Sequence, residues 1–310
     1  MHPRNLCTNT GAVPLGAQGK RSESKDTSKG YSYALAWAML GGTVPVVTKL
    51  IVKGASPIIA SGLAVLLSGV ILIPYRPKAK PRAGNAWLIL GLSLAGATVA
   101  PLLYFTGVQE STAVNASLLS NGEVLFTALM AFAIFHESLR RRQLAEGLLI
   151  AAGVVVISAN LQSGGASLTQ GLGGNILIVG ATIFWSIDNN LSRVASQRES
   201  LSTIAKFKGL IGGGVTMVFL AFTSSFAVPQ TSLPLIVLLA VIFTTMTLLS
   251  VSALRLIGAV RTLLVFSTSS LFGPLIAFLV LGEGISTIQV LGGALILSGV
   301  YLIQRSEVAL

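Results

Sequence analysis

The segment SLLSNGEVLFTALMAFAIFHE, from Ser117 to Glu137, places one carboxylate, Glu123, in the middle of a long apolar run. At 100° per residue, Ser120, Glu123 and Thr127 fall on one stripe of a helix, and leucines lie on the opposite side. An ionised carboxylate facing lipid would be very costly, so the pattern predicts that Glu123 points into a helical bundle. Acids in such places commonly serve ion, proton or substrate pathways. The alternative is a protonated Glu that hydrogen-bonds a neighbouring helix without changing state.

A second polar pattern lies in the segment IFWSIDNNLSRV, residues 183–194. Trp185 and Asn189 share one helical stripe, and an aromatic face with an amide can hold a polar organic molecule. Ordinary packing is the alternative for both residues. We expect one central cavity bordered by Trp185, Asn189, Asn121 and Ser269.

Asp188 falls on a different side of that helix from the stripe. Lys206 and Lys208 begin the next span and enter from the same side of the membrane. An ion pair between Asp188 and Lys206 or Lys208 would lower the cost of burying each group, so we expect a structural pair. Contact of Asp188 with substrate, and extension of the lysines to the lipid headgroups, are the alternatives.

Enzyme chemistry finds no support in the sequence. Cys7 is the one cysteine, and His2 and His136 are the two histidines. An intramolecular disulfide is therefore impossible, and the sequence has neither a GxSxG nor an HExxH motif. We expect a protein that is not an enzyme and that has no metal and no cofactor.

The composition identifies the elements that must position these residues. Of 310 residues, 53% are apolar and 10% are charged, and the mean hydropathy is +0.80. Apolar runs recur along the chain that are long enough to cross a bilayer, which predicts an all-α polytopic membrane protein. The net charge of +11 gathers in short loops beside these runs, as orientation signals do, and this excludes nucleic acid as a partner. The expected spans are 31 to 52, 57 to 75, 86 to 106, 114 to 135, 143 to 160, 172 to 192, 203 to 226, 234 to 254, 262 to 281 and 287 to 304.

Loop charges predict the orientation of the ten spans. Lys and Arg concentrate in every second loop, and Lys53 is the exception to this alternation. Under the positive-inside rule both termini are cytoplasmic. Residues 1–30 are polar and contain no apolar core, so we expect a disordered cytoplasmic tail.

An internal repeat divides the chain. Residues Leu125 to Ile157 align without gaps with Leu271 to Ile303, and about 13 of the 33 positions are identical. We therefore expect a first five-helix repeat over 31–160 and a second over 171–305. Five is an odd number, so the second repeat is inverted in the membrane. Inverted repeats are typical of secondary transporters, whose site lies between the repeats.

Smaller features suggest structural roles. Glu137 and Glu283 each precede the last helix of a repeat and are expected to cap it. GLIGGG, from Gly209 to Gly214, favours close helix packing. Bends are expected at the prolines within spans, which are Pro45, Pro101 and Pro274. Lys49 and Arg193 occupy equivalent positions in the repeats, and each is expected to anchor a helix end or to attract an anion.

The segments VNASLLSNGEVLFTALMAFAIFHESL and IFWSIDNNLSRV, with the copy at 271 to 303, resemble EamA-type members of the drug/metabolite transporter superfamily. The resemblance covers about residues 31 to 305. It implies export of a small organic metabolite, amino acid or drug from the cytoplasm, by alternating access through a central cavity. It also implies the bacterial inner membrane and a monomer or a homodimer that pairs through the last helix of each repeat.

Other functions stay open on the sequence. An importer or a facilitative carrier of a small metabolite has the same features. A membrane scaffold without transport is also compatible with them. A proton is a further candidate partner, because a lone buried acid can bind one and exchange it for substrate.

Overall fold

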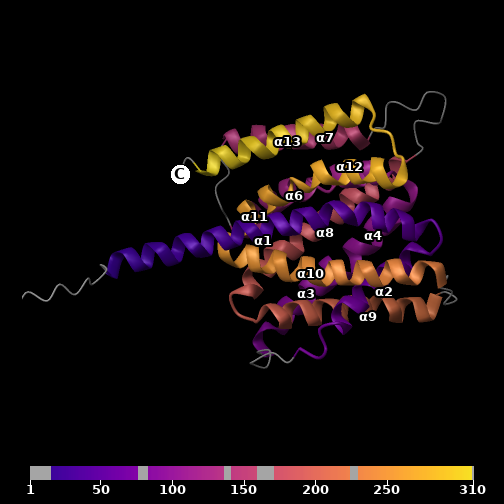
Figure 1. Cartoon of the computed structure of the whole chain (residues 1–310), viewed down its shortest axis with the longest axis horizontal. Coiled ribbons are helices and arrows are strands. Elements are labelled where there is room, and N and C mark those ends of the chain that lie inside the picture. The colour runs from indigo at the N-terminus through magenta and orange to yellow at the C-terminus, as the bar shows by residue number, and fades with distance from the viewer. Residues whose placement is uncertain (1–14, 76–82, 136–140, 159–170, 224–229, 309–310) are drawn as a thin grey trace, which may run out of the picture.

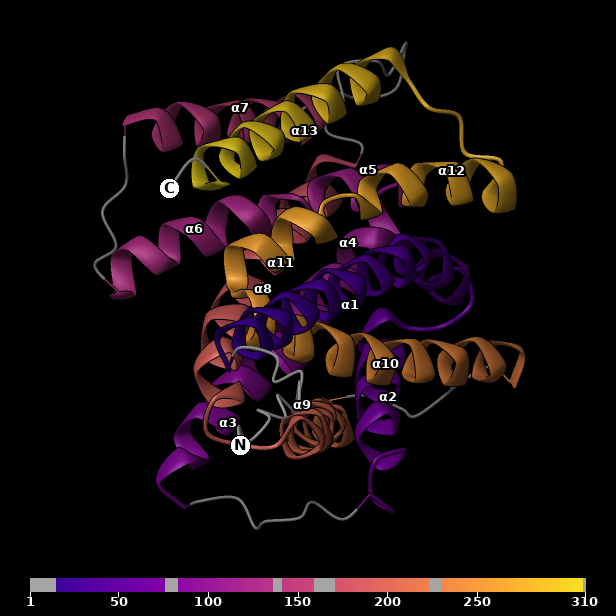
Figure 2. The ribbon, with the colours of Figure 1, turned by 60° about the vertical axis from the view of Figure 1, so that its left-hand side comes forward.

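A computed structural model of the protein describes residues 15–75, 83–135, 141–158, 171–223 and 230–308. Within these ranges the chain is helical, with turns and no strand, as predicted. Figure 1 shows most helices running roughly along the long axis of the molecule, and Figure 2 shows that some of them cross their neighbours steeply. We call the end of the bundle at which the first helix ends the distal end, and the opposite end the proximal end.

Each half of the chain makes five passages through the bundle. The first half consists of α1 (Leu15–Val52), α2 (Pro57–Val70), the passage α3 (Ala86–Leu94), η2 (Ala95–Val99) and α4 (Ala100–Glu110), the pair α5 (Ala113–Leu119) and α6 (Gly122–Phe135), and α7 (Arg141–Ser158). The second half consists of α8 (Leu172–Ser196), α9 (Leu201–Thr223), α10 (Leu233–Ile257), the pair α11 (Ala259–Phe266) and α12 (Ser269–Leu281), and α13 (Thr287–Val308). Two short 3₁₀ turns, η1 (Ala83–Asn85) and η3 (Gln230–Ser232), precede α3 and α10.

Five of the described helical passages are long and apolar enough to cross a membrane, by length and composition. The others are shorter or, like α8, carry polar side chains that the bundle buries. These five passages are Asp26–Val52, Ala86–Glu110, Leu201–Phe222, Gln230–Ile257 and Arg261–Leu281.

The packing of the two halves follows an inverted symmetry. α1 packs against α10 and α12, and its equivalent α8 packs against α4 and α6. α2 packs against its equivalent α9, and α7 against its equivalent α13. Figures 1 and 2 show α1 and α8 in the middle of the molecule, with α7 and α13 paired on one flank and α9 beside α2 on the other. The centre of the bundle is therefore built from both repeats.

α1 begins earlier than the sequence predicts. Its helix starts at Leu15, so residues 15–30 are helical, whereas we expected a disordered tail there; residues 1–14 lie outside the described ranges. The polarity of residues 15–30 explains why they form no apolar core, but polarity does not prevent a helix. Adding residues to a helix that already exists requires no new nucleation, and Ala, Gln, Lys, Arg and Glu favour the helical conformation.

Three passages expected as single regular helices are interrupted. The third contains a π-helical turn, η2, directly before Pro101, where we expected a bend. The fourth and ninth are each divided by a short turn, at Ser120–Asn121 and at Ser267–Thr268. Apolar periodicity continues through all three places, so the pattern could not reveal the interruptions.

The close packing predicted for GLIGGG is confirmed. Gly209 of α9 lies against Gly69 of α2, so closely that a Cβ atom on Gly209 would lie 2.5 Å from the backbone nitrogen of Gly69. Gly212 likewise lies against Ala97 of η2. The glycines let three helices approach at backbone distance on this side of the bundle.

The expected capping role of Glu283 is wrong. Its carboxylate accepts hydrogen bonds from the backbone N–H groups of Ala113 (3.1 Å) and Val114 (3.0 Å), which begin α5 rather than α13. The start of α13 is instead capped by the reciprocal pair of Ser286 and Gln289. Glu137 lies outside the described residues.

Candidate functional site

A cavity of about 140 Å³ lies at the centre of the bundle, between the two repeats. Its walls come from α1, α2, η2, α4, α5 and α6 of the first half and from α8, α9, α10, α11 and α12 of the second. Five of the seven residues for which we expected a binding or coupling role line this cavity, namely Ser120, Glu123, Trp185, Asn189 and Ser269.

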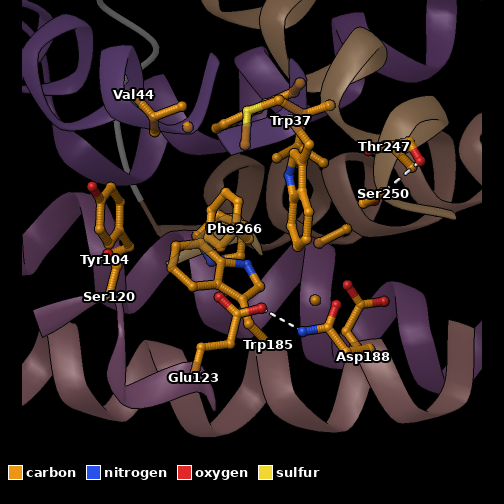
Figure 3. A pocket seen from close by; sticks show the side chains of 18 of the residues that line it. Trp37, Val44, Tyr104, Ser120, Glu123, Trp185, Asp188, Thr247, Ser250 and Phe266 are labelled. Atoms are coloured by element: carbon orange, nitrogen blue, oxygen red, sulfur yellow. Dashed lines mark hydrogen bonds between the residues drawn. The ribbon is translucent and has the colours of Figure 1, made fainter. Parts of the chain in front are cut away.

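Glu123 lies in the first turn of α6 and is 5% exposed. The side-chain amide of Asn189 on α8 donates a hydrogen bond to its Oε1 atom, and Figure 3 shows the carboxylate directed among the side chains that line the cavity. The hydroxyl of Ser186 on α8 donates to the Glu123 carbonyl oxygen at 3.3 Å. Bonds to the side chain and the backbone thus hold Glu123 against α8, and the carboxylate meets the cavity.

The turns within the fourth and ninth passages explain why Glu123 is placed there. In each turn a side chain donates to the carbonyl oxygen three residues earlier: Asn121 Nδ2 to Leu118 at 3.0 Å, and its repeat equivalent Ser267 Oγ to Leu264 at 2.6 Å. The helices α6 and α12 restart directly after these turns. Glu123 and Ser269, which are also equivalent, therefore occupy the first turns of two new helices that face one cavity.

Asn121 itself is not a lining residue, so the expectation that it borders the cavity is wrong. It is described and 3% exposed, and its amide is used to close the turn before α6. The Leu118 carbonyl also accepts from the Asn121 backbone N–H at 3.2 Å, so the backbone and the side chain of Asn121 both serve this turn, which competes with a role in binding.

Thr127 is the second expected residue that does not line the cavity. It is 1% exposed, and its hydroxyl has no hydrogen-bond partner among the described residues. Its backbone carbonyl accepts from Asn190 Nδ2 of α8 at 3.4 Å. The residue lies one helical turn beyond Glu123, where α6 packs directly on α8. The stripe of Ser120, Glu123 and Thr127 thus extends past the edge of the cavity.

Asp188 pairs with Lys208 of α9, and both line the cavity. Ser192 Oγ also donates to Asp188 Oδ1 at 3.1 Å. Lys206 takes no part in this pair; its Nζ donates to the Tyr75 carbonyl oxygen at 3.3 Å. As expected, Asp188 has other direct partners than Trp185 and Asn189, which contact Tyr104 and Glu123, but all three residues line one cavity. The cavity wall follows α8 over an arc of about 100°, which is wide enough to include the adjacent positions 188 and 189.

Aromatic side chains form much of the remaining wall. Trp37 of α1 stacks on Phe266 of α11 with ring centroids 3.8 Å apart, and Tyr104 of α4 lies 5.1 Å from Trp185 of α8. Figure 3 shows these four rings around Glu123 and Asp188.

Trp37, Tyr104 and Phe266 were missed from the sequence because aromatic residues in apolar spans do not stand out. One signal could have identified Phe266, because it is the repeat equivalent of Ser120.

The arrangement suits the binding of a small organic molecule. It offers an acid with an amide partner, an ion pair, and aromatic faces within one partly enclosed space. Within the described ranges, no three His, Cys, Asp or Glu side chains gather as a metal site would require.

Comparison with known proteins agrees with this picture. The EamA-like transporter family matches residues 28–159 and again residues 172–305. A protein of Methanothermobacter thermautotrophicus, described as an uncharacterized transporter, is 30% identical over 297 residues, which cover 88% of this chain and 85% of that protein. An uncharacterized transporter of Archaeoglobus fulgidus is 27% identical over 76% of this chain and 84% of its own length.

A solved crystal structure has the same fold. It superposes with a TM-score of 0.64 over 91% of this chain and 97% of its own, at 18% sequence identity. The two family matches cover both halves of the bundle, and the helices that span the membrane surround one cavity. The chain is therefore an integral membrane protein that belongs to the EamA-like transporter family.

Proposed function

We propose that the protein is a secondary transporter that exports a small organic solute from the bacterial cytoplasm through the central cavity by alternating access. One observation carries this proposal. The cavity lies between two inverted repeats and is lined from both of them, so a rocking of one repeat against the other would expose it to each side in turn.

The side chains of the cavity suggest the chemistry of the solute. Lys208 is the one lysine or arginine among the described lining residues, and it is already paired with Asp188. Glu123 has only the neutral amide of Asn189 as a side-chain partner there. A protonated amine would meet an acid at Glu123, and an apolar or aromatic body would meet the rings of Trp37, Trp185 and Phe266. We therefore propose a small amine with an apolar body as the preferred class.

Loop charges support the orientation. In the described residues, Arg198, Arg255 and Arg261 lie at the proximal end, where α8, α10 and α11 end or begin. The proximal end, with both termini, is then cytoplasmic under the positive-inside rule, and the distal end faces the periplasm.

A charge series on one scaffold tests the substrate class. The purified protein is reconstituted in liposomes and offered phenethylamine, phenylalanine, 3-phenylpropionate and 2-phenylethanol, which are cationic, zwitterionic, anionic and neutral. Binding is followed by tryptophan fluorescence, since two of the three tryptophans line the cavity. We expect phenethylamine to bind most tightly and to show saturable, protein-dependent flux. Stronger binding of the zwitterion or the anion would overturn the amine class, and absence of flux for all four would contradict transport of this kind of solute.

Direction and energy source need separate measurements. Import and facilitated diffusion are compatible with the same cavity, and they differ from proton-coupled export in their response to an imposed pH gradient. Flux that is indifferent to the gradient would favour facilitated diffusion. An untargeted comparison of extracellular metabolites between cells lacking and cells overproducing the protein would identify the natural solute. A metabolite that accumulates outside only with the protein present would support export.

A further inference from the structure

Lys49 of α1 makes an unexpected set of contacts at the distal end of the bundle. Its ammonium group donates to the carbonyl oxygens of Val108 (2.8 Å), Gln109 (3.1 Å) and Ser111. These carbonyls terminate α4, where the helix dipole favours a cation. Gln109 in turn donates to the Val52 carbonyl oxygen at 3.3 Å, so α1 and α4 satisfy each other's last carbonyls. Lys49 thus neither anchors in headgroups nor stands ready for an anion.

Glu283, in the connection between α12 and α13, binds the helix that follows α4. Lys49 donates to carbonyl groups at the end of α4, whereas Glu283 accepts from N–H groups at the start of α5. Its two carboxylate oxygens accept from the first two N–H groups of α5, Ala113 and Val114. A cation therefore holds the end of α4 and an anion holds the start of α5, so both sides of the α4–α5 turn are bound by charged groups from other parts of the chain.

Buried amides link the same turn to the second repeat. Ser111 Oγ donates to Asn175 Oδ1 of α8 at 2.5 Å, and Asn115 Nδ2 donates to the same oxygen at 3.3 Å. Gln289 of α13 donates to Asn115 Oδ1 at 2.7 Å. Asn175 is completely buried, and Ser111 and Asn115 are at most 7% exposed. Removing one member of such a network would leave buried polar atoms without partners.

This cluster lies directly beyond the distal edge of the cavity. The lining residues nearest the distal end are Pro45 on α1, Tyr104 on α4 and Ser117 on α5. The cluster follows about one helical turn further on each helix, at Lys49, at Val108 and at Ala113 to Asn115. A path from the cavity to the distal surface between these helices would have to separate the bonded groups.

We propose that these residues, which we call the distal latch (Lys49, Ser111, Asn115, Asn175, Glu283 and Gln289), form the gate that closes the distal side of the cavity. The latch rests on the proposed alternating access, and it assigns the residues that control one of its two states. When the cavity opens at the distal end, the Lys49 and Glu283 contacts break. Neither residue touches the solute; both act by setting the balance between the two states.

The repeat suggests how the opposite gate is built. Lys49 corresponds to Arg193, and Glu283 to Glu137, so each repeat supplies a basic residue in its first helix and an acid before its last. In the inverted state Arg193 would bind the carbonyls at the end of α10, where Arg255 and Ile257 lie. The two latches would then compete, and loss of one would favour the state that the other closes.

Access of a reagent to the cavity tests the latch without requiring transport. Cys7, the one cysteine, is replaced by Ser, and Val44→Cys places a single thiol on the cavity wall. Labelling by a membrane-impermeant maleimide is timed in vesicles of both orientations, so the side from which label enters is observed. We expect Lys49→Met and Glu283→Gln to speed distal labelling about tenfold, since hydrogen bonds to charged groups are among the stronger ones. The matched control is Lys53→Met, because Lys53 is an exposed lysine at the same end and makes none of the hydrogen bonds described above for the latch.

Several outcomes would overturn the latch. Lys49→Met and Glu283→Gln proteins that label at the rate of Lys53→Met would do so, and so would an equal rise in labelling from both sides. Arg193→Met should slow distal labelling, and a rise would contradict the competition between latches.

If neither latch variant folds, a short cleavable crosslink between Lys49→Cys and Ser111→Cys tests whether these residues close the distal side of the cavity. It should block distal labelling until it is cleaved, and unblocked labelling would refute the gate. If the labelling rates change as expected but no solute is transported, the result counts against the proposed transport and leaves the latch in place.

Discussion

Glu123 and Ser269 occupy equivalent positions in two repeats, yet only one of them can carry charge. Both begin a helix beside the cavity, and both are 5% exposed. The fold thus gives the two halves of the site one geometry, and the side chains make it chemically one-sided. Asp188 adds a second acid, but Lys208 is bound to it. Under the proposed function, Glu123 is therefore the group that a solute or a proton would meet.

Glu123→Gln tests this role. Glutamine keeps the size of the side chain and can still accept from Asn189, but it cannot titrate or carry charge. We expect transport to fall by about tenfold to a hundredfold, the loss that follows from removing a charge-assisted contact, while folding is retained. Initial rates of flux across a range of pH give the measurement. Glu110→Gln, at an exposed acid on α4, serves as the control. A Glu123→Gln protein with the parental rate and pH dependence would make Glu123 a structural hydrogen-bonding group.

The substitution Thr127→Val tests whether transport depends on the whole polar stripe predicted from the sequence or only on the part of it that lines the cavity. The hydroxyl of Thr127 is buried without a partner in the described part of the chain, so its removal costs no hydrogen bond. We expect the free energy of unfolding to stay the same or to rise by up to about 1 kcal/mol, with transport unchanged. Thermal unfolding in detergent and flux in liposomes measure the two effects. If the Thr127→Val protein is as stable as the parent but does not transport, Thr127 is part of the binding site.

Some helices are interrupted where they meet the cavity, and others run without interruption where they pack against each other. The turns before α6 and α12 set Glu123 and Ser269 at helix starts, as discontinuous helices do at the sites of other transporters. The π-helical turn η2 brings Gly96 beside Asp188, where any side chain would overlap the carboxyl group. α2 and α9, in contrast, are uninterrupted through their contact and use glycine to pack closely.

A pair of glycine substitutions on α9 tests that packing. In Gly209→Ala the new methyl group would lie 2.5 Å from the backbone nitrogen of Gly69, so the two helices must separate. We expect a loss of about 1 to 3 kcal/mol in the free energy of unfolding, the usual cost of overpacking. Gly214→Ala is the matched control, because nothing lies within 4 Å of its Cβ position. It should be neutral or stabilise the helix by up to about 1 kcal/mol. Equal thermal unfolding of the two variants would contradict a close contact between α2 and α9.

The molecule as a whole is an inverted pair of five-helix repeats that share one cavity. Its two ends differ. At the distal end a network of buried polar side chains joins the repeats. At the proximal end Asn85 of η1 donates to Glu199, after α8, at 2.7 Å, and the described connections carry arginines.

The orientation of the molecule can be measured with reporter fusions. With both termini in the cytoplasm, a reporter joined after Leu310 should be active only if it functions in the cytoplasm. One inserted at residues 161–170 should be active only in the periplasm, because the positive-inside rule places the arginine-rich connections inside. Active cytoplasmic reporters at 161–170 would refute the ten-span orientation and, with it, the assignment of the distal end to the outside.

Much of this protein follows from local pattern. Apolar length and the 146-residue repeat predict the helices, their number and their inversion, because crossing a membrane forces each segment to satisfy its own backbone. The period of the fourth span also predicts that Glu123 points inward. For the same reason the sequence indicated Ser120, Trp185, Asn189 and Ser269, which line the cavity together.

Other features depend on which helices meet. Asn121 closes a turn, Thr127 packs on α8, Asp188 lines the cavity with Lys208, and Glu283 binds the start of α5 rather than of its own helix. Each outcome depends on partners far away in the chain, and periodicity specifies only the face on which a side chain lies. A helical face becomes cavity, packing surface or latch only when another helix is placed against it, and that placement is a property of the folded bundle.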